Sequence, residues 1–109
     1  MNLTTSEQFV LSRIAAGILQ AGQADGLIST SQWDSYVRQA CSELGTSFDY
    51  IFSINLDVDP FATIRRMSSQ QKNFVKSFLY RWHQKVSSSE RATYYFVSTL
   101  EQGGCIINI

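Results

Sequence analysis

The sequence predicts an all-α fold, a compact single-domain bundle of five to six helices, and three observations lead to this prediction. Apolar residues recur at intervals of three and four along most of the chain, which is the spacing of one buried helix face. No segment shows the sustained alternation of apolar and polar residues that is typical of a half-buried strand. The single proline, Pro60, leaves long uninterrupted stretches on both sides of it.

The length favours one domain. The chain has 109 residues, and a domain over residues 1–109 can bury roughly two-thirds of its unfolded surface. We expect a helical core over about residues 5–102 and an apolar tail over residues 103–109. Two cysteines, Cys41 and Cys105, are too few for a disulfide framework and lack the spacing of metal ligands. Cys41 falls on the apolar face of its helix, so we expect it to be a core residue.

Neither a secretory signal nor a membrane span is expected. Residues 1–24 lack a basic start, and Arg13 interrupts their apolar run. No segment approaches the roughly 18 consecutive apolar residues of a transmembrane helix. We therefore expect a cytoplasmic protein.

The first helix should begin at a capping box opened by Thr4 or Thr5. Its apolar stripe is wide, which predicts a central helix that is contacted on several sides. Gly17 lies in this stripe and would allow another helix to approach closely. The helix should end near residues 21–23, with Gly22 as a plausible terminator.

A tight turn separates the first helix from the second. Asp25-Gly26 supplies the turn, because glycine tolerates positive φ and Asp can accept bonds from nearby backbone amides. Ser29 and Gln32 form a capping box that opens the second helix. Gly45 follows the last apolar residue of that helix and should terminate it.

Two short helices are expected next. Thr46 or Ser47 can cap the first of them, and Asp59 with Pro60 predicts the start of the second, with Asp as N-cap and Pro at the first helical position. The residues expected to face inward are Phe48, Ile51, Phe52 and Ile54 in the third helix, and Phe61, Ile64 and Met67 in the fourth.

Two longer helices should complete the bundle. Ser68 with Gln71 caps the fifth helix, and Ser87 with Glu90 caps the last. The last helix should end at Gly103-Gly104. The tail after it is apolar and is expected to dock on the core or on a partner.

Four segments resemble the tellurite-resistance TerB-like helical domains. They are Ala24–Ser29, the end of the following helix at Glu43–Gly45, Met67–Lys72, and Val86–Glu90. The family pairs two units, each a helix, an Asp-Gly turn and a second helix, around a pseudo-two-fold axis. The resemblance therefore implies a TerB-like bundle over about residues 7–102.

The chain departs from the family at two places. The second unit has Gln84-Lys85 where the family tends to repeat Asp-Gly, and Gln32 stands where Glu is usual. Family members are associated with acidic, sometimes metal-binding surfaces, with stress responses and with membrane-linked complexes. Only Asp25 matches an acidic family position, so the resemblance does not imply a metal site here.

The residues themselves give weak candidates for a metal site. An EF-hand register through Gly26 places Ala21 at the first ligand position, where a carboxylate is required, so calcium binding in this turn is excluded. Asp57 and Asp59 are close enough in sequence to hold a hard cation loosely. Their other interpretation is structural, with Asp59 as a helix cap and Asp57 in a solvated loop. Asp25, Asp57 and Asp59 stay the weak metal candidates, and no cofactor is expected.

No catalytic residue is assigned, and we do not expect an enzyme. The only histidine, His83, has no carboxylate or nucleophile among its sequence neighbours, and it falls in the last turn of a helix. The sequence also lacks a phosphate-binding glycine loop and a nucleophile elbow.

Charge is distributed unevenly although its sum is zero. Residues 1–59 carry seven acidic and two basic side chains, and residues 60–109 carry seven basic and two acidic ones. Two interpretations stay open: the basic half attracts a charged partner, or the two halves face each other and neutralise.

Four residues of the basic half are our candidates for partner binding. Lys72 and Lys76 share one helix face, and Tyr80 and Tyr94 lie off the apolar stripes of their helices. The function expected is a small non-catalytic protein–protein interaction module, which could also form a homodimer. Two alternatives remain: a metal or small-ligand sensor that uses the acidic surface, and a nucleic-acid-associated accessory protein. Zero net charge and a pI near 6.5 disfavour nucleic acid.

Overall fold

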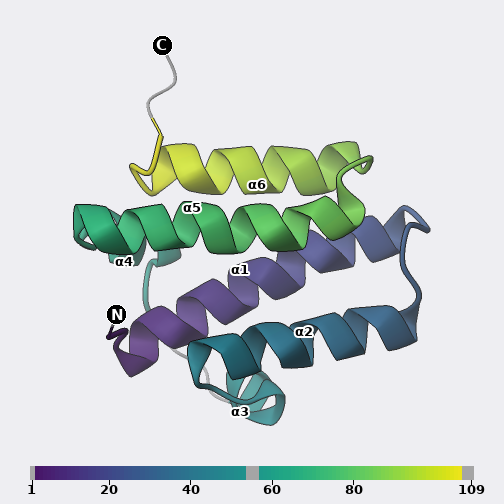
Figure 1. Cartoon of the computed structure of the whole chain (residues 1–109), viewed down its shortest axis with the longest axis horizontal. Coiled ribbons are helices and arrows are strands. Elements are labelled where there is room, and N and C mark those ends of the chain that lie inside the picture. Colours follow the sequence, from purple (N-terminus) through teal and green to yellow (C-terminus); the bar gives the residue numbers. More distant parts are fainter. Residues whose placement is uncertain (1, 54–56, 107–109) are drawn as a thin grey trace.

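The fold is built around one long helix. The computed structural model describes residues 2–53 and 57–106, and in it α1 (Thr5–Ala24) lies at the centre and contacts each of the other helical elements (Figure 1). These are α2 (Thr30–Leu44), α3 (Phe48–Ser53), α4 (Pro60–Arg65), α5 (Ser69–His83), the short 3-10 helix η1 (Gln84–Val86) and α6 (Glu90–Gln102). Helices α2 and α3 cover one side of α1, and α4, α5 and α6 cover the other.

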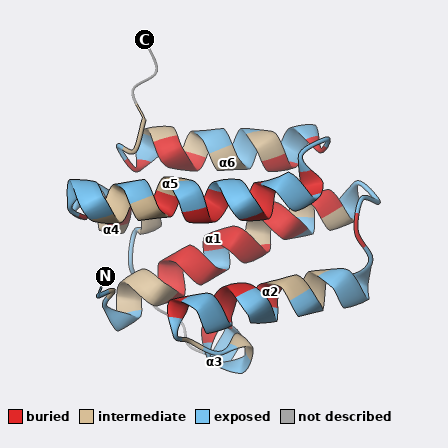
Figure 2. Ribbon diagram, in the orientation of Figure 1, coloured by how far each residue is buried: buried red, intermediate tan, exposed pale blue. Residues whose placement is uncertain are grey.

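The all-α prediction is confirmed. None of the described residues lies in a strand, and the Cα radius of gyration, 13.1 Å, is that of a single domain of this size. Half of the 20 residues of α1 are buried, as expected for a central helix, and the buried faces of the outer helices turn toward it (Figure 2). Within the described residues, no helix combines the length and the apolar character needed to cross a bilayer.

Most helix starts follow the predicted caps. Thr4, Ser29 and Ser68 each open a helix with a complete capping box, in which the hydroxyl accepts from the third helical amide. Asp59 caps α4, accepting from the amides of Phe61 and Ala62. These starts are local in sequence, because the cap and its partner lie three residues apart or fewer.

The predicted cap of α6 is wrong. The N-cap is Ser89, whose hydroxyl accepts from the Ala92 amide at 3.1 Å, and Ser87 is not a cap. The chain continues beyond α5 as η1, so Ser87 still has a helical backbone, with φ −64° and ψ −21°. Ser89 is the residue with the extended backbone that an N-cap requires, with φ −80° and ψ 118°.

Gly22 does not terminate α1, which continues to Ala24 with Asp25 as its C-cap. The glycine instead permits close packing: a Cβ at this position would lie 2.1 Å from Cγ1 of Val86. Gly17 has the role that the sequence predicts, because the ring of Tyr95 from α6 lies against it. Both glycines therefore let the C-terminal part of the chain approach α1.

The short helices depart from prediction in detail. In α3, Ile51 is fully buried, whereas Phe52, expected to face inward, is 47% exposed and packs at its edge against the rings of Trp33 and Phe48. A six-residue helix has too narrow a buried face to cover three large side chains. Ile54 lies outside the described residues. Met67 is buried, although it follows the end of α4.

The two cysteines lie in different surroundings. Cys41 is buried in the core, as expected, and Cys105 is half-buried beside Lys72 and Lys76 of α5. Both thiols are free. The part of the tail that is described, Cys105 and Ile106, packs against the core, and residues 107–109 lie outside the description.

Candidate interaction surface

The uneven charge of the sequence becomes two differently charged sides of the molecule. The acidic half forms α1, α2 and α3, and the basic half forms α4, α5, η1 and α6. Over residues 2–53 and 57–106 there are two ion pairs, Asp34–Arg38 within α2 and Glu43–Arg81 between the halves. Neutralisation between the halves is therefore limited to one pair. Among these residues, the cations of the basic half without a carboxylate partner are Arg65, Arg66, Lys72, Lys76, Lys85 and Arg91.

Three of the four predicted partner-binding residues lie together. Lys72, Lys76 and Tyr80 follow one another at four-residue spacing along α5, on the side that faces α6. Both lysines lie near enough to Cys105, which follows α6, to act electrostatically on its thiol, and the ring centroid of Tyr80 is 6.4 Å from that of Phe96 in α6. Tyr80 is 54% exposed, so its ring is available along this seam. We call these three residues the α5–α6 seam.

Tyr94 is the most exposed aromatic residue described, at 76%, but it points elsewhere. It lies on α6 two residues before Phe96, and two residues on a helix are about 200° apart. Phe96 packs toward α5, so Tyr94 points to the opposite side of α6. The structure therefore does not bring Tyr94 into the seam.

The acidic candidates do not form a cluster. Asp25 lies at the turn between α1 and α2, whereas Asp57 and Asp59 precede α4, which packs near the other end of α1 (Figure 1). Asp25 accepts a 2.6 Å hydrogen bond from the Ser89 hydroxyl, and Asp59 caps α4. In the described part of the chain, no group of three His, Cys, Asp or Glu residues is arranged to hold a metal ion.

His83 is held as a neutral core residue. It is only 8% exposed, its ring stacks on Phe96 at 4.7 Å, and Nε2 lies 2.8 Å from the hydroxyl of Thr93. That hydroxyl also lies 3.4 Å from the Ser87 carbonyl, and the tautomer of His83 decides whether the hydroxyl donates there or to Nε2. Nδ1 is buried without a partner among the described residues. Burial accordingly lowers the pKa of His83.

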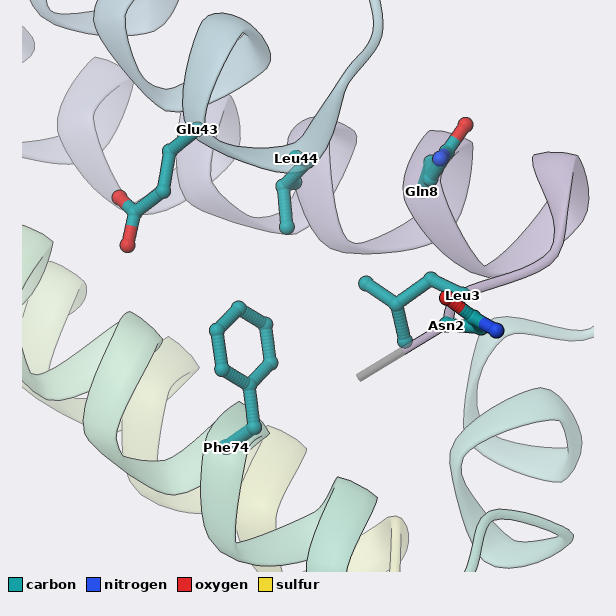
Figure 3. Close-up of a pocket in the computed structure, with 6 residues that line it drawn as sticks. All are labelled: Asn2, Leu3, Gln8, Glu43, Leu44 and Phe74. Atoms are coloured by element: carbon teal, nitrogen blue, oxygen red, sulfur yellow. The ribbon is translucent and has the colours of Figure 1, made fainter.

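One cleft lies where the N-terminal residues, α2 and α5 meet (Figure 3). Leu44 and Phe74 point into it from α2 and α5, Leu3 lines it from the N-terminal segment, and the Glu43 carboxylate lies at its edge. Its volume is about 400 Å³, and its remaining lining residues are Asn2 and Gln8. Glu43 is already paired with Arg81, so the described residues that line this cleft include no free charged group.

A second cleft lies between α2 and the end of α5. It has a volume of about 380 Å³ and is lined by Gln39, Arg81, Trp82, Gln84 and Lys85. We call it the Trp82 groove. Its only local signal in the sequence is that Arg81 and Lys85 are four residues apart, beside Trp82, the last apolar residue of α5. The spacing along α5 does not show that α2 forms the opposite wall of the groove.

The fold and surface define a class, an all-α single domain with a basic side and an acidic side. Compared with protein-family models, curated proteins and solved structures, the chain gives no match. The TerB-like arrangement therefore stays a prediction that is based on the four segments quoted above.

Proposed function

We propose that the chain is a non-catalytic interaction module that binds an acidic protein partner through the α5–α6 seam. The observation that carries this proposal is the row of cations without carboxylate partners beside an exposed tyrosine. Lys72 and Lys76 supply positive charge, and Tyr80 supplies a rigid amphipathic ring of the kind enriched at interface centres. Charges of this kind steer an oppositely charged protein and fix its orientation.

The two alternative functions have less support. A metal sensor needs convergent carboxylates, but Asp25 and Asp59 each serve a helix end at separate places in the fold. A nucleic-acid partner needs many phosphate contacts, and the acidic half of this small domain would repel the rest of a polyanion. A protein partner of limited size can contact the basic side alone.

The proposal is tested by capturing partners from native lysate on the tagged chain, at low and high salt. We expect a stoichiometric partner that high salt releases, because ionic screening shortens the reach of surface charges. The double variant Lys72→Glu/Lys76→Glu should recover at least about tenfold less of it. Its unfolding free energy should change by only about 0.5 kcal/mol, as for other surface substitutions.

A matched control separates the seam from overall charge. Lys76→Glu and Arg38→Glu change the net charge equally, but Arg38 lies on α2, on the other side of α1. Only Lys76→Glu should weaken partner recovery. Equal recovery with both variants would contradict binding through the α5–α6 seam. The absence of any partner at either salt concentration would contradict the proposal that the chain is an interaction module.

A further inference from the structure

The Trp82 groove combines a buried aromatic floor with an exposed polar rim. Trp82 is 7% exposed, whereas Gln39, Arg81, Gln84 and Lys85 are exposed around it. The ring of Tyr36 in α2 lies 6.0 Å from the Trp82 ring, and the Lys85 ammonium lies 5.2 Å from the centre of the Tyr36 ring. The groove is therefore a built junction of α2, α5 and η1.

Hydrogen-bond donors outnumber acceptors in this groove. The indole N–H of Trp82 has no acceptor among the described residues, whereas that of Trp33 donates to the Ala16 carbonyl at 3.0 Å. Lys85 has no carboxylate partner within the described chain, and Arg81 shares its charge with Glu43. The Trp82 N–H is itself fully buried, so Lys85 and the edge of Arg81 that Glu43 leaves free are the donors that favour a ligand with carboxylate acceptors.

We propose that the Trp82 groove binds a carboxylate side chain from an acidic segment of a partner protein. The carboxylate meets Lys85 and the free edge of Arg81, and its methylene stem lies on the aromatic floor formed by Trp82. This inference rests on the proposed function for the existence of an acidic protein partner. It adds a second contact site, on the α2 side of α5 and apart from the α5–α6 seam.

The shape of the groove selects a protein segment over a small anion. Sites for small molecules bury most of the ligand surface, and the ring of exposed side chains here leaves one side of the groove open. A segment of a partner can cover that open side with its own surface. Arginine is also among the side chains that most often carry the binding energy of such interfaces, and Arg81 is exposed at the rim.

The indole signals of the two tryptophans provide a direct test. In an ¹⁵N–¹H correlation spectrum of the intact chain, Trp82→Phe assigns the Trp82 signal. A short capped peptide of glutamate residues is then titrated, with the matching glutamine peptide as control. We expect the Trp82 signal to shift saturably with the glutamate peptide alone, because the carboxylate binds beside its ring, while the Trp33 signal stays fixed, because Trp33 does not line the groove.

Charge reversal then locates the carboxylate. Lys85→Glu should weaken the peptide affinity reported by Trp82 by about tenfold or more, and Arg66→Glu, an equal charge change at the C-terminal cap of α4, should leave it unaltered. Retention of a dispersed amide spectrum shows that both variants fold.

The outcomes distinguish this inference from the proposed function. If Trp82 stays fixed while the signals of Lys72 and Lys76 move, the groove proposal is overturned and the seam stands. If the glutamine peptide shifts the Trp82 signal as much as the glutamate peptide does, the proposal that the groove binds a carboxylate is overturned. If no signal moves saturably, the groove proposal is overturned, and the salt-sensitive capture then decides the interaction module separately.

Discussion

The chemistry of His83 is set by its surroundings in the fold. Phe96 stacks on its ring, Nε2 is hydrogen-bonded to the Thr93 hydroxyl, and Nδ1 is buried without a partner among the described residues. Protonation would place a positive charge and an unmet N–H inside the protein. The folded state therefore disfavours the proton that the unfolded chain accepts readily.

A pH dependence of stability follows from this difference. Burial lowers the pKa of His83 below 6.5 in the folded state, so the unfolded state binds more protons as the pH falls below that value. The contribution of His83 to the unfolding free energy should be constant above about pH 7 and should fall toward pH 5.5, by at most about 1.4 kcal/mol per pH unit. His83→Gln should give a flatter profile in denaturant unfolding over this range. Parallel profiles for both proteins would refute the assignment.

At the scale of elements, one serine joins two distant turns. The Ser89 hydroxyl accepts from the Ala92 amide at the start of α6 and donates to Asp25 at the end of α1. The hydrogen bond to Asp25 spans 64 residues of sequence. Ser89 is therefore both a helix cap and a tertiary contact.

Ser89→Ala should destabilise the protein by about 1–2 kcal/mol, because it removes the cap and leaves the Asp25 carboxylate without this donor. Ser87→Ala is the matched control. Its side chain caps nothing, and the carbonyl that accepts from Thr93 belongs to the backbone and is kept. We expect it to change stability by less than about 0.5 kcal/mol in denaturant unfolding. An equal loss in the two variants would argue against Ser89 as the cap.

The same region shows what the sequence can predict and where it fails. The boxes at Thr4, Ser29 and Ser68 were predicted because each is complete within a few residues. Three consecutive serines precede α6, and the choice among them depends on how far η1 prolongs the preceding helix. The prediction that Gly22 ends α1 was wrong for a similar reason. The side chain that occupies the space beside Gly22 belongs to Val86, which lies 64 positions further along the chain.

The two candidate surfaces also differ in how far the sequence alone predicts them. Spacing along one helix placed Lys72 and Lys76 on one face and Tyr80 off the apolar stripe, and the structure shows that Tyr80 continues the row of the two lysines. The Trp82 groove needs a wall from α2, and no local pattern encodes how α2 packs against α5. Contacts between elements far apart in sequence decide both the groove and the separation of charge.

The whole molecule is organised by α1, which packs against both the acidic and the basic side. The two sides touch each other directly at few places, among them the Glu43–Arg81 pair and the contact of Tyr36 with Trp82. Each side therefore buries its apolar face mainly against the same central helix. Unfolding one side would expose half of that helix, so the two sides should unfold together.

The two tryptophans can measure this coupling, because one reports on each side. Trp33 packs with α3 and bonds to α1 on the acidic side, and Trp82 belongs to α5 on the basic side. We expect the single-tryptophan proteins Trp33→Phe and Trp82→Phe each to give one fluorescence transition in urea that coincides with their own loss of helical circular dichroism. Adding Ile18→Ala, a substitution in the fully buried centre of α1, should lower the stability of both by the same amount, about 2–5 kcal/mol. If one tryptophan keeps its transition while the other loses stability, the two sides are separate cooperative units and α1 does not couple them.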